Sequence, residues 1–241
     1  MKAVILAAGR GTRISRYLNG NPKCTVEIGG GTVLIKYTVD LLKKAGVKDI
    51  AVCVGYKSEA VEKALVGENV KFYYNPFYDV TNSIASAWFA RDFFAAEDTL
   101  IMNGDVYIEE NLLSDVMKEK LSPCLFSDET RKEEADYKLK YDNGILRKYG
   151  KELEGEDISG EYIGIAKLDA GYINGFLNRM EDMINRQKHN VWWENVLYEL
   201  SEESSVFVRD VKGEFWAEVD YIEDYKRILE HRGADISEIL R

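Results

Sequence analysis

The stretch Ala3-Val4-Ile5-Leu6-Ala7-Ala8-Gly9-Arg10-Gly11-Thr12-Arg13 places an apolar run directly before a glycine-rich turn. The run is typical of a buried strand in a parallel sheet. Glycines let backbone N–H groups approach phosphate oxygens, and the arginines, together with Lys23 further along, supply neutralising charge. We therefore expect this turn to hold a polyphosphate at the end of the first strand.

Two better-known glycine motifs are excluded. A Walker A loop requires Gly-x-x-x-x-Gly-Lys-Ser/Thr, which the chain does not contain. The dinucleotide fingerprint Gly-x-Gly-x-x-Gly fails because Ile14 takes the place of the third glycine and no acidic ribose partner is evident. A tight turn with two solvated arginines would explain the glycines, but it would not explain Pro22-Lys23.

The composition narrows the function classes. The chain has 241 residues, of which 46% are hydrophobic, enough for a sizeable core. Its formal net charge is −10, which disfavours nucleic acid and anionic membranes as partners. The three cysteines are widely spaced without a metal-ligand pattern, and Met1 leads straight into a strand without a signal peptide. We expect a cytoplasmic protein that is not inserted in a membrane.

The first half alternates between strand and helix patterns. After the first strand, the expected elements are a helix over Ile35–Ala45, a strand over Asp49–Gly55, a helix over Ser58–Leu65 with Ser58 as N-cap, a strand over Val70–Tyr74, a helix over Ser83–Phe94 and a strand over Thr99–Met102. This alternation predicts an α/β fold, Rossmann-like and doubly wound around a mostly parallel mixed sheet. Ligands bind such sheets at the carboxyl ends of the strands.

The second half changes character. Asp142-Asn143-Gly144 indicates a hairpin between Tyr137–Tyr141 and Ile145–Tyr149. The remaining expected elements are strands over Tyr162–Leu168, Val206–Asp210 and Phe215–Val219, the last two meeting around Lys212-Gly213, and helices over Ala170–Arg186, Glu194–Leu200 and Ile222–His231. Because no proline- or serine-rich linker divides the chain, we expect a single domain over residues 1–241.

Two aspartates end predicted strands. Asp105 follows Leu100-Ile101-Met102-Asn103-Gly104, and Asp220 follows Trp216-Ala217-Glu218-Val219. Such residues can be helix caps or turn residues, but paired carboxylates at strand ends also suit Mg²⁺. Alternation places Glu218 on the same face as Asp220, and whether Glu218 touches a metal stays open.

The N-terminal string with Pro22-Lys23 resembles the signature of the nucleotidyltransferase superfamily, the nucleoside triphosphate transferases. These enzymes move a nucleoside monophosphate onto a phosphorylated small molecule and release pyrophosphate. The resemblance implies a GT-A-like nucleotidyltransferase fold and Mg²⁺ held by Asp105 and Asp220. Lys23 would stabilise the α-phosphate and Arg13 would grip the β- and γ-phosphates. The implied nucleotide contacts are Leu6, Ala7, Ala8, Gly9, Arg10, Gly11, Thr12, Gly55, Asn82 and Ser83, with solvation as the alternative for Arg10 and helix capping for Asn82 and Ser83.

Most of the chain more closely resembles bacterial cytidylyltransferases that act on phosphocholine, 2-aminoethylphosphonate or inositol phosphate. The marks are Asn75 with Asn82-Ser83-Ile84-Ala85-Ser86, Trp193-Glu194-Asn195, and the run from Gly213 to Asp224. The resemblance implies that CTP is joined to a small phosphorylated or phosphonate acceptor, with phosphocholine or 2-aminoethylphosphonate favoured. Residues 1–120 would mainly bind the nucleotide and residues 121–241 the acceptor.

Other functions stay open. The segment Lys148-Tyr149-Gly150-Lys151-Glu152-Leu153 is similar to the inositol-phosphate type, so an inositol-phosphate or sugar-1-phosphate nucleotidyltransferase is the alternative. A non-catalytic nucleotide-sensing module is more remote, since it would be expected to lack Lys23 or a metal aspartate. The base, the acceptor and the oligomeric state are not fixed, with a homodimer as one candidate.

Aromatic residues in the second half suggest an acceptor pocket. Trp192, Trp193 and Glu194, with Tyr78 and Tyr162, could enclose a cationic amine through cation–π contacts and one carboxylate. The alternative is that the tryptophans only anchor the helix that they precede. Glu161 and Gly164 fall where sugar-phosphate relatives contact the acceptor.

Overall fold

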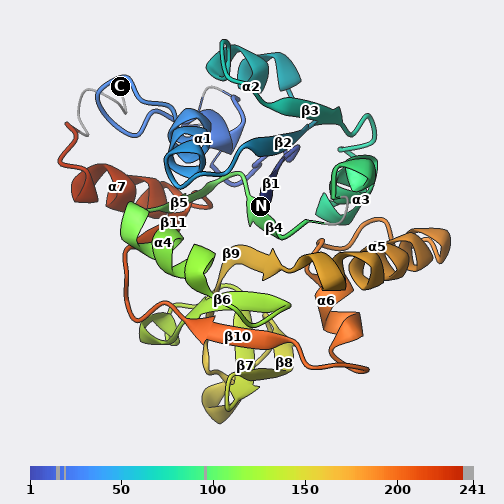
Figure 1. Cartoon of the computed structure of the whole chain (residues 1–241). Coiled ribbons are helices and arrows are strands. Elements are labelled where there is room, and N and C mark those ends of the chain that lie inside the picture. Colours follow the sequence, from blue (N-terminus) through green and yellow to red (C-terminus); the bar gives the residue numbers. More distant parts are fainter. Residues whose placement is uncertain (15–16, 19, 95–96, 236–241) are drawn as a thin grey trace.

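The computed structural model describes residues 1–14, 17–18, 20–94 and 97–235 (Figure 1). These residues form a nine-stranded sheet in the order β3-β2-β1-β4-β9-β6-β10-β8-β7 and a two-stranded sheet of β5 and β11. The strands are β1 (Lys2–Ala7), β2 (Asp49–Val54), β3 (Lys71–Tyr74), β4 (Thr99–Asn103), β5 (Val106–Ile108), β6 (Cys124–Asp128), β7 (Lys138–Asp142), β8 (Ile145–Gly150), β9 (Gly160–Leu168), β10 (Phe207–Asp210) and β11 (Trp216–Glu218).

The strands β3, β2, β1 and β4 are parallel, as the sequence predicts for the first half. Leu6 on β1 lies opposite Asn103 on β4, so the two carboxyl ends are adjacent. The amide of Gly104 donates to the Leu6 carbonyl at 2.8 Å. A Cβ at Gly104 would lie 2.8 Å from the Cβ of Ala7, so only glycine permits this approach. The glycine-rich turn and Asp105 are thereby brought side by side.

The expectation of a mostly parallel sheet is wrong for the second half. β9 is antiparallel to both β4 and β6, and β8 is antiparallel to both β7 and β10. Parallel pairing returns only between β6 and β10 among the described strands of this half. β9 is buried along its whole length. Burial on both faces suits either strand direction, which is why the sequence could not reveal the direction of β9.

Helices cover both faces of the sheet. The α-helices are α1 (Leu34–Lys44), α2 (Ser58–Ala64), α3 (Ser83–Phe89), α4 (Glu110–Lys118), α5 (Ala170–Asn185), α6 (Asn195–Leu200) and α7 (Ile222–His231). On β1, Ile5 packs in a core with α1, α2 and α4, whereas Val4 and Leu6 pack in a second core with α3, α5 and α6. This division follows from the two-residue period of a strand. No helix among the described residues combines the length and the apolar character needed to cross a membrane.

A third core lies between β5, β11 and α7. The sequence predicts that the strands now seen as β10 and β11 meet around Lys212-Gly213, and this is wrong: β10 pairs with β6 and β8, whereas β11 pairs with β5. Lys212 and Gly213 both have positive φ, and the turn they form redirects the chain from one sheet to the other. The sequence reading also missed β5, α4 and β6.

The structure also tests the predictions that rest on short stretches of sequence. The predicted hairpin forms between β7 and β8, with Asn143 and Gly144 both at positive φ as its two-residue turn requires. Ser58 is not the N-cap of α2, because that position belongs to Lys57, in the left-handed region. The helix expected over residues 83–94 divides at Ala90. Short 3-10 helices are η1 (Lys23–Thr25), η2 (Arg91–Phe94), η3 (Glu129–Arg131) and η4 (Gly155–Asp157).

Candidate active site

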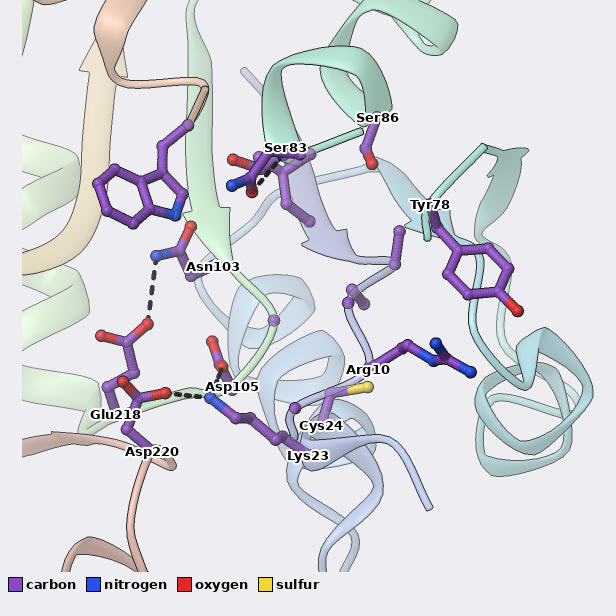
Figure 2. A pocket seen from close by; sticks show the side chains of 18 of the residues that line it. Arg10, Lys23, Cys24, Tyr78, Ser83, Ser86, Asn103, Asp105, Glu218 and Asp220 are labelled. Atoms are coloured by element: carbon purple, nitrogen blue, oxygen red, sulfur yellow. Dashed lines mark hydrogen bonds and ion pairs between the residues drawn. The ribbon is translucent and has the colours of Figure 1, made fainter. Parts of the chain in front are cut away.

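A cavity of about 600 Å³ opens at the carboxyl ends of β1 and β4 (Figure 2). The predicted residues that line it are Leu6, Ala7, Ala8, Gly9, Arg10, Gly11, Thr12, Arg13, Lys23, Tyr78, Asn82, Ser83, Asp105, Tyr162, Trp192, Glu194 and Asp220. Residues from both halves of the chain therefore share one space. The placement agrees with the expectation that ligands of such sheets bind at the carboxyl ends of the strands.

The glycine-rich turn and Lys23 fit one another closely. Gly11 has φ +59°, and a Cβ there would lie 2.5 Å from Cγ of Lys23. A side chain at position 11 would therefore displace the stem of Lys23, so Gly11 is needed both for its backbone conformation and for space. Lys23 itself is at the start of η1, directly after Pro22. The guanidinium of Arg10 lies over the ring of Tyr56, 5.5 Å from its centroid.

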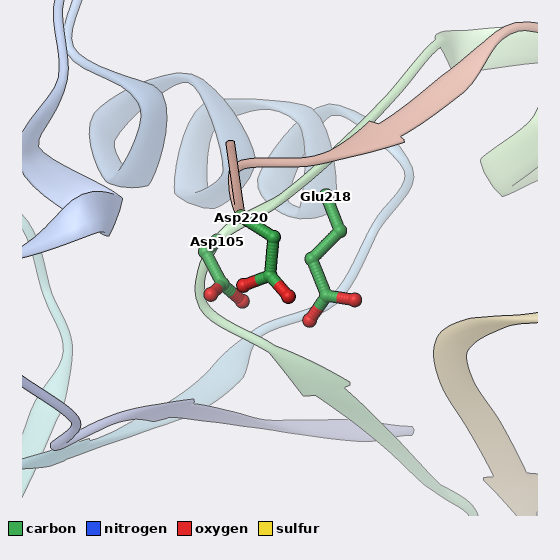
Figure 3. Close-up of side chains that lie close together, drawn as sticks. All are labelled: Asp105, Glu218 and Asp220. Atoms are coloured by element: carbon green, nitrogen blue, oxygen red, sulfur yellow. The ribbon is translucent and has the colours of Figure 1, made fainter. Parts of the chain in front are cut away.

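Three carboxylates converge on one side of the cavity (Figure 3). Asp105 comes from the link between β4 and β5, Glu218 ends β11, and Asp220 immediately precedes the turn into α7. One oxygen atom from each lies within 4.8 Å of the others. These oxygen ligands, at this spacing, are of the kind that hard divalent cations such as Mg²⁺ prefer. Glu218, which the sequence analysis left open, is thus part of the cluster.

Two cations lie against this cluster. Nζ of Lys23 is 3.2 Å from Oδ2 of Asp105 and is also ion-paired with Asp220. Arg13 donates to the second carboxylate oxygen of Asp220 at 2.6 Å. Burial acts to lower the pKa of Lys23, but the carboxylates of Asp105 and Asp220 outweigh it and raise that pKa above its usual value. Lys23 is consequently a fixed positive charge at any physiological pH.

The charge cluster also acts on Glu218. Loss of contact with water, together with the neighbouring carboxylates of Asp105 and Asp220, raises the pKa of Glu218 well above its usual value, although Lys23 opposes the shift. Asn103 donates from Nδ2 to Oε1 of Glu218 at 3.4 Å. Three acids this close together favour either a shared proton or a bound cation.

A second group of cavity residues is aromatic and acidic. Tyr162, Trp192 and Glu194 line the cavity together with Tyr137 and Tyr198, which the sequence analysis did not single out. Glu194 is 6% exposed, and burial raises the pKa of its carboxyl to about 8. A cationic group of a ligand placed beside this carboxyl would favour its ionised form and pair with it.

Further residues of the cavity were not among the predicted site residues. Asp136 and Lys151 form an ion pair of 2.6 Å beside it, and Oδ2 of the same Asp136 lies 3.9 Å from Arg13. Asn75 holds a buried hydrogen-bond network by donating to Thr81 and Ser86, each at 3.0 Å. The clearest signal available in the sequence was Asn103, a polar residue at the end of an otherwise apolar strand.

Trp193 and Gly55 were predicted to contact ligands, but both lie outside the cavity lining. The indole of Trp193 is fully buried and donates to Oδ1 of Asn103 at 3.0 Å, so it belongs to the core. Gly55 serves packing: a Cβ there would lie 2.7 Å from the Cβ of Tyr78 and 2.9 Å from the carbonyl oxygen of Ala8. Gly55 therefore lets Tyr78 approach the end of β1.

Glu161 and Gly164, predicted to contact the acceptor, are also outside the lining. Glu161 accepts from Nε of Arg131 at 2.8 Å and from the amide of Asp136 at 2.9 Å, so it anchors the segment that carries Asp136. Gly164 has φ +76°, and a Cβ there would lie 3.0 Å from Nδ2 of Asn103. Both residues support neighbours that do face the cavity.

Asn82 and Ser83 line the cavity while also holding α3 in place. Asn82 is the N-cap of α3, and its side chain accepts from the amide of Ser83 at 2.8 Å. The hydroxyl of Ser83 accepts from the backbone amide of Trp193 at 2.9 Å. The capping role that the sequence left open as the alternative is therefore present for Asn82, and the two residues also tie the two halves of the chain together at this wall.

The fold and the cavity together define the protein as a nucleotidyltransferase. Residues 3–138 match the MobA-like NTP transferase domain, and the chain belongs to that family. The expected resemblance to nucleoside triphosphate transferases is thereby confirmed.

Individual relatives match over nearly the whole chain. A choline-phosphate cytidylyltransferase from Streptococcus pneumoniae is 25% identical over 239 residues, covering 95% of this chain and 97% of the relative. A CTP:phosphoglutamine cytidylyltransferase from Campylobacter jejuni is 26% identical, covering 95% of this chain and 100% of the relative. The solved structure of the CTP:phosphocholine cytidylyltransferase from S. pneumoniae has a TM-score of 0.80 at 24% identity, over 96% of this chain and 98% of that one, and shows the same fold.

Proposed function

We propose that the protein is a magnesium-dependent cytidylyltransferase. It would join CTP to a small phosphorylated or phosphonate acceptor that carries an amine, and release pyrophosphate. The observation that carries the proposal is the position of Lys23, which lies between the glycine-rich turn and the carboxylates of Asp105 and Asp220 in one cavity. The names of the two relatives, which act on choline phosphate and phosphoglutamine, support the choice of CTP and of a nitrogen-bearing acceptor.

The chemistry needs alignment and charge neutralisation more than a base. A phosphate or phosphonate oxygen of the acceptor, already an anion at neutral pH, attacks the α-phosphorus of CTP as the bond to pyrophosphate breaks. Backbone amides of the turn from Gly9 to Thr12 would hold the triphosphate. Lys23 would stabilise the charge on the α-phosphate, and Arg13 the departing pyrophosphate.

The carboxylates of Asp105, Glu218 and Asp220 fit a magnesium ion, since they offer oxygen ligands within 4.8 Å of one another. Bound Mg²⁺ would neutralise charge on the nucleotide phosphates. Without the nucleotide, Lys23 and Arg13 neutralise two of these carboxylates. Both cations would exchange a carboxylate partner for phosphate oxygens when the substrate enters, so the site keeps its net charge low throughout.

The acceptor would occupy the end formed by Tyr162, Trp192 and Glu194, its amine facing the buried acid. Its phosphate or phosphonate would then point toward Asp136, which joins Arg13 and Lys151. An incoming anion can replace Asp136 as the partner of Lys151, which leaves Arg13 to the departing pyrophosphate. This orientation sets the acceptor oxygen against the α-phosphate.

The test is a pyrophosphate-release screen that crosses four nucleoside triphosphates with phosphocholine, 2-aminoethylphosphonate, inositol-1-phosphate and glucose-1-phosphate. We expect turnover with CTP and an amine-bearing acceptor. Turnover confined to glucose-1-phosphate with UTP or dTTP, or to inositol-1-phosphate, would replace the proposal by the alternative that the sequence left open. Nucleotide binding without pyrophosphate release from any pair of nucleotide and acceptor would indicate a non-catalytic nucleotide-sensing module.

A further inference from the structure

The inner end of the cavity holds three buried polar atoms that lack hydrogen-bond partners within the described part of the chain. They are Oε2 of Glu194 and the hydroxyl oxygens of Tyr162 and Tyr198. The three residues are 6%, 5% and 1% exposed, and all of them line the cavity. Buried polar atoms are nearly always paired, so three unpaired ones at one place indicate a ligand that supplies the missing partners.

Two aromatic rings at this end of the cavity already have partners, those of Tyr198 and Trp192. The ring of Tyr198 stacks with that of Tyr149, at 4.0 Å between centroids, and with that of Tyr137, at 5.9 Å. The indole of Trp192 has the ammonium of Lys151 5.6 Å from its centroid and the edge of Tyr137 against it. Trp192, one member of the cation–π cage that the sequence predicts, thus already has a cation beside it. What these residues offer a ligand is oxygen atoms.

We propose, on the basis of the cytidylyltransferase function, that this end of the cavity selects an acceptor whose nitrogen is a primary ammonium group. A primary ammonium group supplies a positive counter-charge to the carboxylate of Glu194. It also supplies three N–H donors for the unpaired oxygens. A trimethylammonium group carries the same charge but no donor. Its binding would leave the carboxylate oxygen and both hydroxyls buried and unpaired, which is the situation in which a site rejects an analogue most strongly.

Neighbouring charges agree with this selection. Asn103 accepts from Trp193 and donates to Glu218, and Oε2 of Glu194 is left without a hydrogen-bond partner among the described residues. Lys151, which also lines this end, is held by Asp136. A neutral hydroxyl donor, such as that of an inositol, would leave Glu194 without a counter-charge. The ammonium group satisfies both the charge and the hydrogen bonds.

The experiment uses CTP with four acceptors that differ only in methylation of the nitrogen: phosphoethanolamine, its N-methyl and N,N-dimethyl derivatives, and phosphocholine. All four nitrogens carry one positive charge, while the number of N–H donors falls from three to none. We expect kcat/KM for the acceptor to fall stepwise, by about 100-fold or more across the series, with the KM for CTP unchanged. Equal or better turnover of phosphocholine would overturn the selection.

A matched pair of variants tests the oxygens themselves. Tyr162→Phe removes a hydroxyl that has no partner, so it should leave the melting temperature unchanged or raised. The variant should lower kcat/KM for phosphoethanolamine about tenfold and leave kcat/KM for phosphocholine unchanged. The ratio of the two kcat/KM values should therefore become smaller. Tyr149→Phe, which lies outside the cavity lining, should preserve the ratio. An unchanged ratio in Tyr162→Phe would contradict the assignment of this hydroxyl.

The outcomes separate the two proposals. Absence of pyrophosphate release from CTP with every acceptor of the series and of the wider screen would overturn the cytidylyltransferase function. If pyrophosphate is released from CTP but more efficiently with the methylated acceptors, the cytidylyltransferase function stands. Only the selection of a primary ammonium is then overturned.

Discussion

The indole Nε1 of Trp193 donates a hydrogen bond of 3.0 Å to Oδ1 of Asn103. Because an indole nitrogen can only donate, it fixes which end of the Asn103 amide is the acceptor. The N–H₂ group must then face the other way, and it donates to Oε1 of Glu218. A core residue of the second half of the chain thus orients a polar residue at the end of β4, beside the carboxylate cluster.

Replacing Trp193 by Phe should therefore destabilise the protein. The change opens a small cavity and leaves the amide oxygen of Asn103 without its donor, a loss of about 2–4 kcal/mol in the free energy of unfolding. Urea unfolding measures this. Trp192→Phe is the control, because Trp192 is 42% exposed and should change stability little. A Trp193 variant of normal stability that binds only the acceptor more weakly would return Trp193 to the acceptor pocket.

What the sequence could predict was set by consecutive residues. The strand and turn from Ala3 to Arg13, the hairpin around Asn143-Gly144 and the final helix are each encoded within about a dozen residues, where patterning and turn chemistry act directly. Asp105 and Asp220 could be placed at strand ends for the same reason. That they meet was inferred from the resemblance, since their separation along the chain exceeds any local pattern.

What the sequence could not predict depends on contacts between distant segments. Strand direction in the second half is decided by which neighbours β9 finds, and its apolar residues would suit either direction. Trp193 is as suitable for a pocket as for a core, and only the position of Asn103 decides between them. The pairing of Asp136 with Lys151 joins two loops whose surface charges carry no sign of a partner.

Lys23→Ala should lower kcat by at least about 100-fold while the fold stays intact, because a preorganised cation near the reacting phosphate supplies one of the main catalytic terms. The pyrophosphate-release assay measures this, with circular dichroism as the check on folding. Lys36→Ala, which removes ion pairs with Asp40 and Glu68 outside the cavity lining, is the control and should keep its activity. Activity of Lys23→Ala close to that of the control would remove Lys23 from the mechanism.

Asp105→Asn should weaken activation by magnesium, because it removes one of the three converging carboxylates. We expect the Mg²⁺ concentration for half-maximal rate to rise at least about tenfold and kcat to fall. Asp115→Asn, at an exposed position on α4, should behave as the unmodified enzyme. Excess EDTA should abolish the activity of the unmodified enzyme and of both variants, and added Mg²⁺ should restore it. Full turnover in the presence of EDTA would contradict the metal site.

Gly55→Ala should raise the KM for CTP, because the added methyl group would meet Tyr78 and the Ala8 carbonyl and so disturb the wall beside the glycine-rich turn. The expected loss of stability is about 1–3 kcal/mol. Gly175→Ala is a matched control within α5, where a Cβ meets no atom within 4 Å, and it should stabilise the helix by up to about 1 kcal/mol. Thermal unfolding and CTP titration of both variants test the difference. Equal behaviour would show that Gly55 is not needed for packing.

The buried carboxyl of Glu194 should make acceptor binding depend on pH. Burial raises its pKa to about 8, so the carboxyl is mostly protonated at about pH 6.5 and ionised above about pH 8.5. Only the ionised form attracts an ammonium group, and the KM for 2-aminoethylphosphonate should fall as pH rises through this range, by at most about tenfold per pH unit.

Glu194→Gln should give a high KM without this fall, and comparison with this variant cancels the effect of the acceptor's own ionisation. Glu199→Gln, whose carboxylate is paired with Arg186 and Lys188 outside the cavity, should retain the fall. Identical pH profiles in Glu194→Gln and the unmodified enzyme would show that Glu194 does not face the amine.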